Sequence, residues 1–251
     1  MGELAEFPLD GADKPSRQER LESLRRRIAA IPARGEMERV GPVGLSTGRP
    51  LPVPPPLADV LPHGGLVRGS VVVVSGATSL LIGILASVTA AGGHAAVIGH
   101  RRLSLLAAAE MGAQLRRVAV IPDPGPDPVE IAAVLLDGMD LVVLGLGGAV
   151  VPPSRSRAVT ARARNKGAVL VVVDGRWDGA QLRLDAQVGG YDGVGKGRGR
   201  LCGTRLSVRA QGRSFPERTT RMDVSAVRTR IEWAHADRSD PFSRPGRPVA
   251  W

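Results

Sequence analysis

The chain has 251 residues, which is enough for one large core with flexible ends or for two small domains. Hydrophobic residues make up 43% of it, and its longest apolar runs have the length of strands, so a membrane-spanning helix is excluded. The formal net charge of +10 comes mainly from arginine and favours nucleic acid or an acidic protein surface as a partner, although a general bias toward arginine would explain the charge equally well.

The cellular compartment is indicated by the cysteine content and by the first residues. Cys202 is the single cysteine, so no internal disulfide can form. Residues 1–6 are acidic and lack the basic and apolar regions of a secretory signal. We therefore expect a cytoplasmic protein that does not engage a membrane, and a secreted protein with few cysteines stays open as the alternative.

The first predicted element is an amphipathic helix over residues 15–31, with Ser16 and Glu19 forming a capping box. Its apolar positions are Leu21, Leu24, Ile28 and Ile31. This face can dock on a partner or fold back on the chain's own core. Residues 40–62 are rich in proline and glycine and predict a linker, which favours docking on a partner.

Strands and helices alternate from Gly64 onward. The predicted strands are residues 71–74, 94–99, 118–121, 140–144 and 168–173. The predicted helices are residues 80–91, 103–111, 129–136 and 154–166. Continuous apolar strands that alternate with helices indicate βαβ units and a parallel sheet that is covered on both faces.

The pattern changes after Asp174. Residues 181–187, 201–210 and 221–224 predict shorter, more polar strands, and the Gly/Arg-rich segment 193–200 predicts a loop between two of them. The predicted fold class is therefore α/β: a mostly parallel sheet with helices on both faces, an antiparallel C-terminal extension and an N-terminal helix. We expect a helical segment at 1–39, a linker at 40–62, a core at 63–225 and a flexible tail at 226–251.

The turn after the first strand has the setting of a phosphate-binding loop, in which backbone N–H groups and a helix N-terminus hold phosphates. The ATP-binding form, G-x-x-x-x-G-K-[ST], needs a lysine for the phosphates and a hydroxyl for Mg²⁺. Here leucine stands at the lysine position and isoleucine at the hydroxyl position. The degenerate turn consists of Ser75, Gly76, Ala77, Thr78, Ser79, Leu80, Leu81 and Ile82.

Other catalytic signals are also absent from the sequence. The strand 140–144 is followed by Gly145 where a metal-binding acid would be expected, and Asp140 lies at its opposite end. The histidines are scattered and do not pair with cysteine in a metal-like spacing. We therefore expect a non-enzyme without a catalytic residue, a cofactor or a metal.

Several runs resemble the ATPase core of the RecA family. They are residues 61–69, 75–79, 105–113 and 117–123. In that family the last two correspond to a helix ending in glycine and then a strand followed by a loop that opens with Pro-Asp. The amphipathic helix at 16–31 also lies where RecA carries its N-terminal polymerisation helix.

Within that family the chain is most similar to the actinobacterial branch of the ImuA group. The similarity covers roughly residues 55–210 and is carried by residues 75–81, 121–125, 136–145 and 161–167. It implies an accessory protein of DNA-damage-inducible mutagenesis, which would associate with the nucleoid when it is engaged with its partners. Such a protein joins an inactive Y-family polymerase homologue and an error-prone C-family polymerase in a translesion complex. The missing lysine, hydroxyl and acidic positions put ATP-driven filament formation in doubt, and RecA-like self-association stays open.

Two further binding hypotheses rest on residue type. Lys196, Arg198 and Arg200 could contact DNA phosphates, although only Tyr191 is near enough to stack on a base, and the same segment reads equally as a flexible hairpin. Trp233 and Trp251 lie in a polar C-terminal region and are candidate anchors for a partner. The arginines of helix 154–166 are expected to form a solvated face.

Two alternative functions remain open at this point. One is a SulA-like inhibitor of cell division, since that family also resembles RecA without its phosphate loop. The other is a RecA-like, DNA-dependent ATPase that uses an unorthodox loop.

Overall fold

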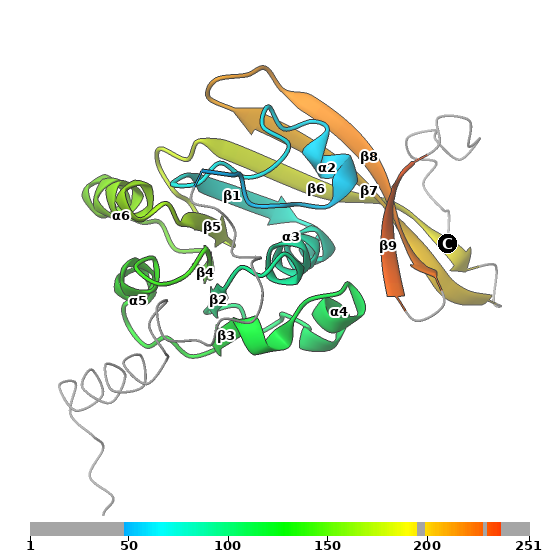
Figure 1. Cartoon of the computed structure of the whole chain (residues 1–251), viewed down its shortest axis with the longest axis horizontal. Helices are drawn as coiled ribbons and strands as arrows, with labels where there is room; N and C mark the ends of the chain where they lie inside the picture. Colours follow the sequence, from blue (N-terminus) through cyan, green and yellow to red (C-terminus); the bar gives the residue numbers. More distant parts are fainter. Residues whose placement is uncertain (1–47, 195–198, 228–229, 237–251) are drawn as a thin grey trace, which may run out of the picture. The chain divides into compact units, whose positions relative to one another are not determined.

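The computed structural model describes residues 48–194, 199–227 and 230–236. In these ranges a nine-stranded sheet has the order β3-β2-β4-β5-β1-β6-β7-β8-β9 (Figure 1). The strands are β1 (Val71–Gly76), β2 (Ala95–Ile98), β3 (Val118–Ile121), β4 (Leu141–Gly145), β5 (Val169–Val173), β6 (Leu182–Val194), β7 (Gly199–Gly212), β8 (Arg218–Val227) and β9 (Arg230–His235). The helices are α2 (Pro55–Ala58), α3 (Thr78–Ala90), α4 (Leu105–Glu110), α5 (Pro128–Leu135), α6 (Pro153–Lys166) and the 3-10 turn η1 (Leu115–Arg117).

Strands β1 to β5 are parallel to their neighbours, and β6 is parallel to β1. Every residue of β2, β4 and β5 is buried, as expected for apolar strands that are covered on both faces. Their side chains alternate between two cores: Val72 and Val74 point to one, and Val71 and Val73 point to the other.

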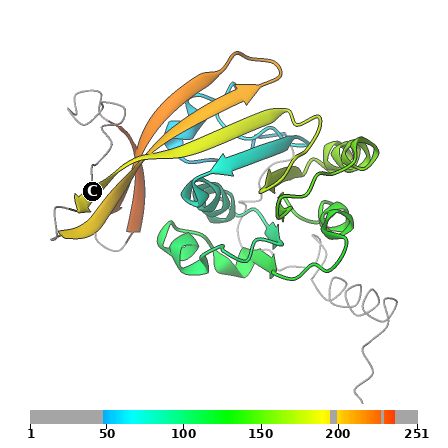
Figure 2. The same ribbon diagram turned by 180° about the vertical axis from the view of Figure 1, so that it is seen from behind.

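Helices cover both faces of this parallel region (Figures 1 and 2). Residues of α2, α3 and α4 belong to the first core, and residues of α5 and α6 belong to the second. Trp177, in the connection from β5 to β6, is fully buried in the second core. The predicted sheet with helices on both faces is therefore confirmed, and this is the architecture that the resemblance to RecA implies.

Local capping residues fix where the helices begin and end. Asp127 caps α5 by accepting a hydrogen bond from the Glu130 N–H at 3.1 Å, and Pro128 follows as the first helical residue. In α6 a proline again starts the helix, and Gly167 ends it in the left-handed conformation with φ of 64°. These signals explain why both helices lie within about a residue or two of their predicted positions.

The C-terminal strands form the predicted antiparallel extension. β7 is antiparallel to β6, β8 to β7 and β9 to β8. They are longer than predicted, with 13 residues in β6 and 14 in β7, because the polar residues that we expected to end them lie on the exposed positions of the strands. β6 also joins β1 in parallel, so it continues the central sheet.

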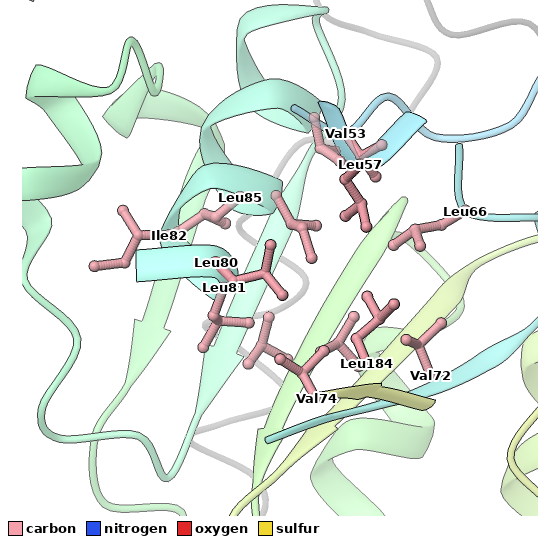
Figure 3. Close-up of a cluster of buried hydrophobic side chains, with 14 of the residues drawn as sticks. Val53, Leu57, Leu66, Val72, Val74, Leu80, Leu81, Ile82, Leu85 and Leu184 are labelled. Carbon is pink, nitrogen blue, oxygen red and sulfur yellow. The ribbon is translucent and has the colours of Figure 1, made fainter. Parts of the chain in front are cut away.

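The predicted linker at 40–62 is wrong for the part that the structure describes. Leu51 forms two backbone hydrogen bonds with Leu66, and residues 55–58 form α2. The side chains of Leu51, Val53 and Leu57 are buried in the first core, and Figure 3 shows Val53 and Leu57 beside α3. Burial of these apolar residues outweighs the preference of the intervening prolines for an extended, solvated chain.

The predicted flexible tail from residue 226 is also wrong for residues 230–236. Residues 230–235 form β9, which pairs with β8 at Val224↔Trp233. The His235 Nε2 lies 2.8 Å from the Asp59 carboxylate, just after α2. β9 therefore closes over the α2 side of the sheet.

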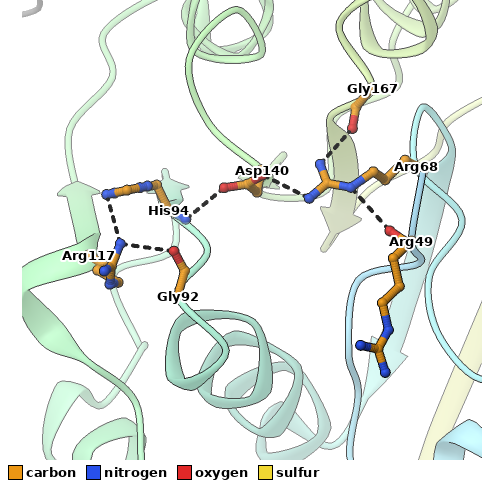
Figure 4. Close-up of polar contacts among 7 residues, drawn as sticks. All are labelled: Arg49, Arg68, Gly92, His94, Arg117, Asp140 and Gly167. Carbon is orange, nitrogen blue, oxygen red and sulfur yellow. Dashed lines mark hydrogen bonds and ion pairs between the residues drawn. The ribbon is translucent and has the colours of Figure 1, made fainter. Parts of the chain in front are cut away.

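A line of polar contacts joins the amino ends of the parallel strands (Figure 4). Arg68, before β1, lies 3.0 Å from a carboxylate oxygen of Asp140, before β4, and donates to the Gly167 carbonyl before β5. The other oxygen of Asp140 accepts from the His94 N–H before β2 at 2.9 Å. Arg117, before β3, contacts the His94 ring and the Gly92 carbonyl.

The predicted N-terminal helix at 15–31 lies outside the described residues. No helix in the described ranges is long and apolar enough to cross a membrane.

The Arg68–Asp140 pair yields a stability prediction. Both side chains are less than a tenth exposed, so Asp140→Ala leaves an uncompensated buried guanidinium and should lower the free energy of unfolding by about 3–5 kcal/mol in urea titrations. Asp137→Ala is the matched control, because its pair with Arg162 is solvent-exposed and should contribute less than about 1 kcal/mol. Equal losses from the two substitutions would show that burial does not govern this pair.

Candidate functional site

The turn between β1 and α3 occupies the position of a phosphate-binding loop and is one residue long. β1 continues through Ser75 and Gly76, and α3 begins at Thr78, so Ala77 alone connects them. A phosphate loop needs several successive backbone N–H groups arranged around an anion. Here most of the corresponding residues are already committed to the strand or to the helix.

Contact with β6 closes this turn. The Ala77 N–H donates to the Ala186 carbonyl at 2.8 Å. Gly76 has φ of +85°, and a Cβ at this position would overlap the same carbonyl. The glycine therefore serves close packing of β6 against β1, and one N–H that could have faced a phosphate is used inside the sheet.

The first turns of α3 direct apolar side chains into the core (Figure 3). Leu80, Leu81 and Ile82 are at most 5% exposed and pack with residues of the first core. The residues at the positions where the ATP-binding pattern requires glycine, lysine and a hydroxyl therefore pack in the core. The sequence showed the wrong residue types, and the geometry adds that these side chains face inward.

Trp233 covers the next residue of the helix. A Cβ on Gly83 would overlap the indole ring of Trp233, so the two are in close contact. Trp233 is partly buried and packs against the first core from β9. The expectation that Trp233 lies in a disordered tail is therefore wrong, because its ring finds an apolar surface on its own chain.

The carboxyl edge of the sheet carries a pair that the sequence did not reveal. The His100 Nδ1 lies 3.5 Å from the Asp174 carboxylate, bringing together the residues that follow β2 and β5. The His100 side chain is 9% exposed, and its Nε2 has no hydrogen-bond partner among the described residues. Asp174 adopts φ of +52°, the one non-glycine residue with positive φ in the described part of the chain. Only the parallel topology could have indicated this pair.

A metal or nucleotide site needs more groups than this edge provides. In the described ranges no group of three histidine, cysteine, aspartate or glutamate side chains converges on one point. Asp123, after β3, is engaged by Arg101, and Asp140 lies at the opposite edge in the contacts described above.

The arginines of α6 divide between two faces. Arg155 and Arg162 pair with Asp127 and Asp137 near the two ends of α5, at 2.5 and 2.6 Å. The hydrogen bond from the Arg162 guanidinium holds the pKa of Asp137 below its ordinary value. The charges of Arg155 and Arg162, two of the four arginines expected on a solvated face, are therefore neutralised by ion pairs.

The other two arginines of α6 line an open groove of about 640 Å³. Arg157 and Arg164 lie on its α6 side, and Arg213, in the turn from β7 to β8, lies opposite. None of these three exposed side chains forms an ion pair or side-chain hydrogen bond that is recorded in the described part of the chain. The groove is thus a basic surface. The sequence did not distinguish its arginines from the two arginines of α6 that form ion pairs.

The remaining predicted binding residues lie mostly outside the described ranges. These are Leu21, Leu24, Ile28, Ile31, Lys196, Arg198 and Trp251. Arg200 belongs to β7, and its side chain is not described. Their proposed roles stay predictions.

Two family descriptions match adjacent parts of this chain. Residues 59–179 match the family described as the MT3502 N-terminal domain, and residues 182–228 match the Rv3395c C-terminal domain. The boundary between them falls just before β6. The uncharacterized protein Rv3395c of Mycobacterium tuberculosis is 52% identical over 204 residues, which cover 78% of this chain and 93% of that protein.

A solved structure, the RadB recombinase, has a similar arrangement at 14% identity with a TM-score of 0.48. The match covers 75% of this chain and 99% of RadB. No conclusion about function follows from a likeness of this size.

The closed turn predicts that restoring the missing side chains will not restore a nucleotide site. In the double variant Leu81→Lys/Ile82→Thr we expect no binding of a fluorescent ATP analogue with Mg²⁺. We also expect a loss of several kcal/mol in urea unfolding, since an unpaired lysine is placed in the core. Thr78→Lys, at the exposed start of the same helix, should fold normally. ATP binding by the double variant would contradict the geometry described here.

Proposed function

This chain belongs to the family of the Mycobacterium tuberculosis protein Rv3395c, and we propose that it is a non-catalytic, RecA-like accessory protein of a translesion complex. It acts in the cytoplasm by binding partner proteins. Its partners in this proposal are an inactive Y-family polymerase homologue and an error-prone C-family polymerase, with DNA as a further contact.

The observation that carries the non-catalytic part is the turn at Ala77. Catalysis of phosphoryl transfer depends on positioning the phosphates and on neutralising their charge. A one-residue turn that is bonded to β6, followed by inward-facing leucines, offers neither the cradle nor the cation. This supports an α/β core used as a scaffold.

The translesion assignment rests on the resemblance to the ImuA group in residues 75–81, 121–125, 136–145 and 161–167. Two of these runs have structural roles here: residues 75–81 form the closed turn and the start of α3, and 161–167 form the end of α6 with its terminal glycine. These residues therefore support a shared fold, and the partners come from the resemblance alone.

Co-purification tests this proposal. The tagged full chain is co-expressed with both polymerases from the same genome, and we expect it to retain the Y-family homologue and the C-family polymerase together. In the predicted N-terminal helix, Leu24→Asp/Ile28→Asp should reduce capture of a partner about tenfold or more, because charge replaces the predicted apolar face. Arg26→Asp/Ala30→Asp, with the same spacing on the predicted polar face, is the matched control.

Two results would contradict the proposal. One is that neither polymerase is retained by the wild-type chain. The other is growth of undamaged cells as filaments when the chain is overexpressed, which would favour the SulA-like alternative.

A further inference from the structure

The charge on α6 is distributed unevenly between its two sides. The helix carries four arginines and one lysine and has no acidic residue of its own. Asp137 neutralises Arg162 and also lies 3.7 Å from Lys166, and Asp127 neutralises Arg155. The two α6 arginines outside these ion pairs, Arg157 and Arg164, lie on the groove side.

The groove follows one stripe of the helix. Its α6 residues are Pro153, Ser156, Arg157, Thr160, Ala161 and Arg164. They recur every three or four positions, so they form a straight line of small side chains with an arginine at intervals of seven residues, about 10 Å along the axis. The opposite wall consists of Asp178, Gly179, Gln181 and Arg213. With three arginines and one aspartate, the lining has a net charge of +2.

This wall is held in a fixed position. The Gln181 side chain accepts a hydrogen bond from the Val71 N–H at 2.7 Å, and the Arg213 N–H donates to the Gln181 carbonyl at 3.1 Å. Trp177, four residues before Gln181, is buried beneath the connection. The groove is therefore framed by a helix on one side and by anchored backbone on the other.

The chemistry of the lining distinguishes between two kinds of anionic partner. Proteins that bind single-stranded nucleic acid combine cations with aromatic side chains on which bases stack, and the residues lining this groove include no aromatic side chain. Asp178 would also repel a continuous phosphate backbone. A helix with carboxylates at separated positions can meet the arginines and leave small or apolar residues facing Thr160 and Ala161.

We propose that this groove binds an acidic amphipathic helix of a partner protein, with Arg157, Arg164 and Arg213 pairing with its carboxylates. The inference rests on the proposed partner-binding role and assigns one surface to it. α6 is about 21 Å long, which suits a partner helix of three to four turns.

Fluorescence anisotropy of the full chain tests the proposal. The probe is a labelled synthetic helical peptide of alanine, leucine and glutamate, with leucine and glutamate on adjoining stripes. The matched peptide has glutamine in place of every glutamate. We expect the wild-type chain to bind the glutamate peptide at low salt, and we expect weaker binding of the glutamine peptide.

The chain offers a matched pair of double variants on the same helix. Arg157→Ala/Arg164→Ala should weaken binding of the glutamate peptide by about tenfold or more and leave the unfolding midpoint unchanged. Arg155→Ala/Arg162→Ala removes the same charge at the same spacing from the paired face and should retain wild-type affinity. Arg213→Ala should weaken binding by several-fold, because it removes the cation of the opposite wall.

Three outcomes would overturn the inference: no binding of the glutamate peptide, equal binding by the two double variants, or loss of oligothymidine binding in Arg157→Ala/Arg164→Ala while peptide binding is unchanged. The last outcome would assign the groove to nucleic acid. Failure here is distinguishable from failure of the translesion role. If the chain captures the polymerases but does not bind the peptide, only the proposal for the groove is contradicted. If it binds the peptide but captures no polymerase, only the translesion role is contradicted.

Discussion

The hydrogen bond from the Ala77 N–H to the Ala186 carbonyl determines the geometry of the turn between β1 and α3. It requires β6 to lie directly beside the end of β1, which the positive φ of Gly76 permits. With β1 extended to Gly76, α3 must begin almost at once, and its first apolar side chains turn into the core. The place where a phosphate-binding loop would hold phosphates becomes part of the packing between sheet and helix.

The rest of the described sheet is consistent with this constraint. β6 continues into long antiparallel strands, and β9 returns so that Trp233 packs over Gly83 of α3. At the amino ends of the parallel strands, the buried ion pair between Arg68 and Asp140 connects the start of β1 to the start of β4. Polar groups are thus used for structure at the amino edge, and unpaired cations remain on the outside, along α6. This distribution suits a protein that acts through its surface.

The sequence predicted the parallel strands closely because they are short apolar runs bounded by glycine and polar residues, and these local signals agree with the final packing. The sequence-based predictions were wrong where long-range contacts determine the local structure. The linker was predicted at residues 40–62 because of their prolines and glycines. In the described part of it, burial of Leu51 and Leu57 in the first core overrides that signal. In β9, Ile231 and Trp233 alternate with polar residues, a strand signal that the expectation of a tail obscured.

For the candidate binding surfaces, too, the sequence showed the residue types but not the long-range contacts. The loss of the phosphate-loop residues was visible in the sequence, but the one-residue turn was not, because it depends on β6, about a hundred residues away. The i, i+7 spacing of Arg157 and Arg164 was also visible. Which arginines pair with the two aspartates that flank α5 is decided by tertiary packing, so the sequence did not show it. His100 and Asp174 become neighbours only through the strand order.

Isothermal titration of the full wild-type chain with ATP and Mg²⁺ tests the central claim most directly. The account predicts no binding heat at millimolar nucleotide, since the turn at Ala77 offers no cradle for phosphates. Micromolar binding would contradict it and would require a nucleotide site elsewhere in the chain.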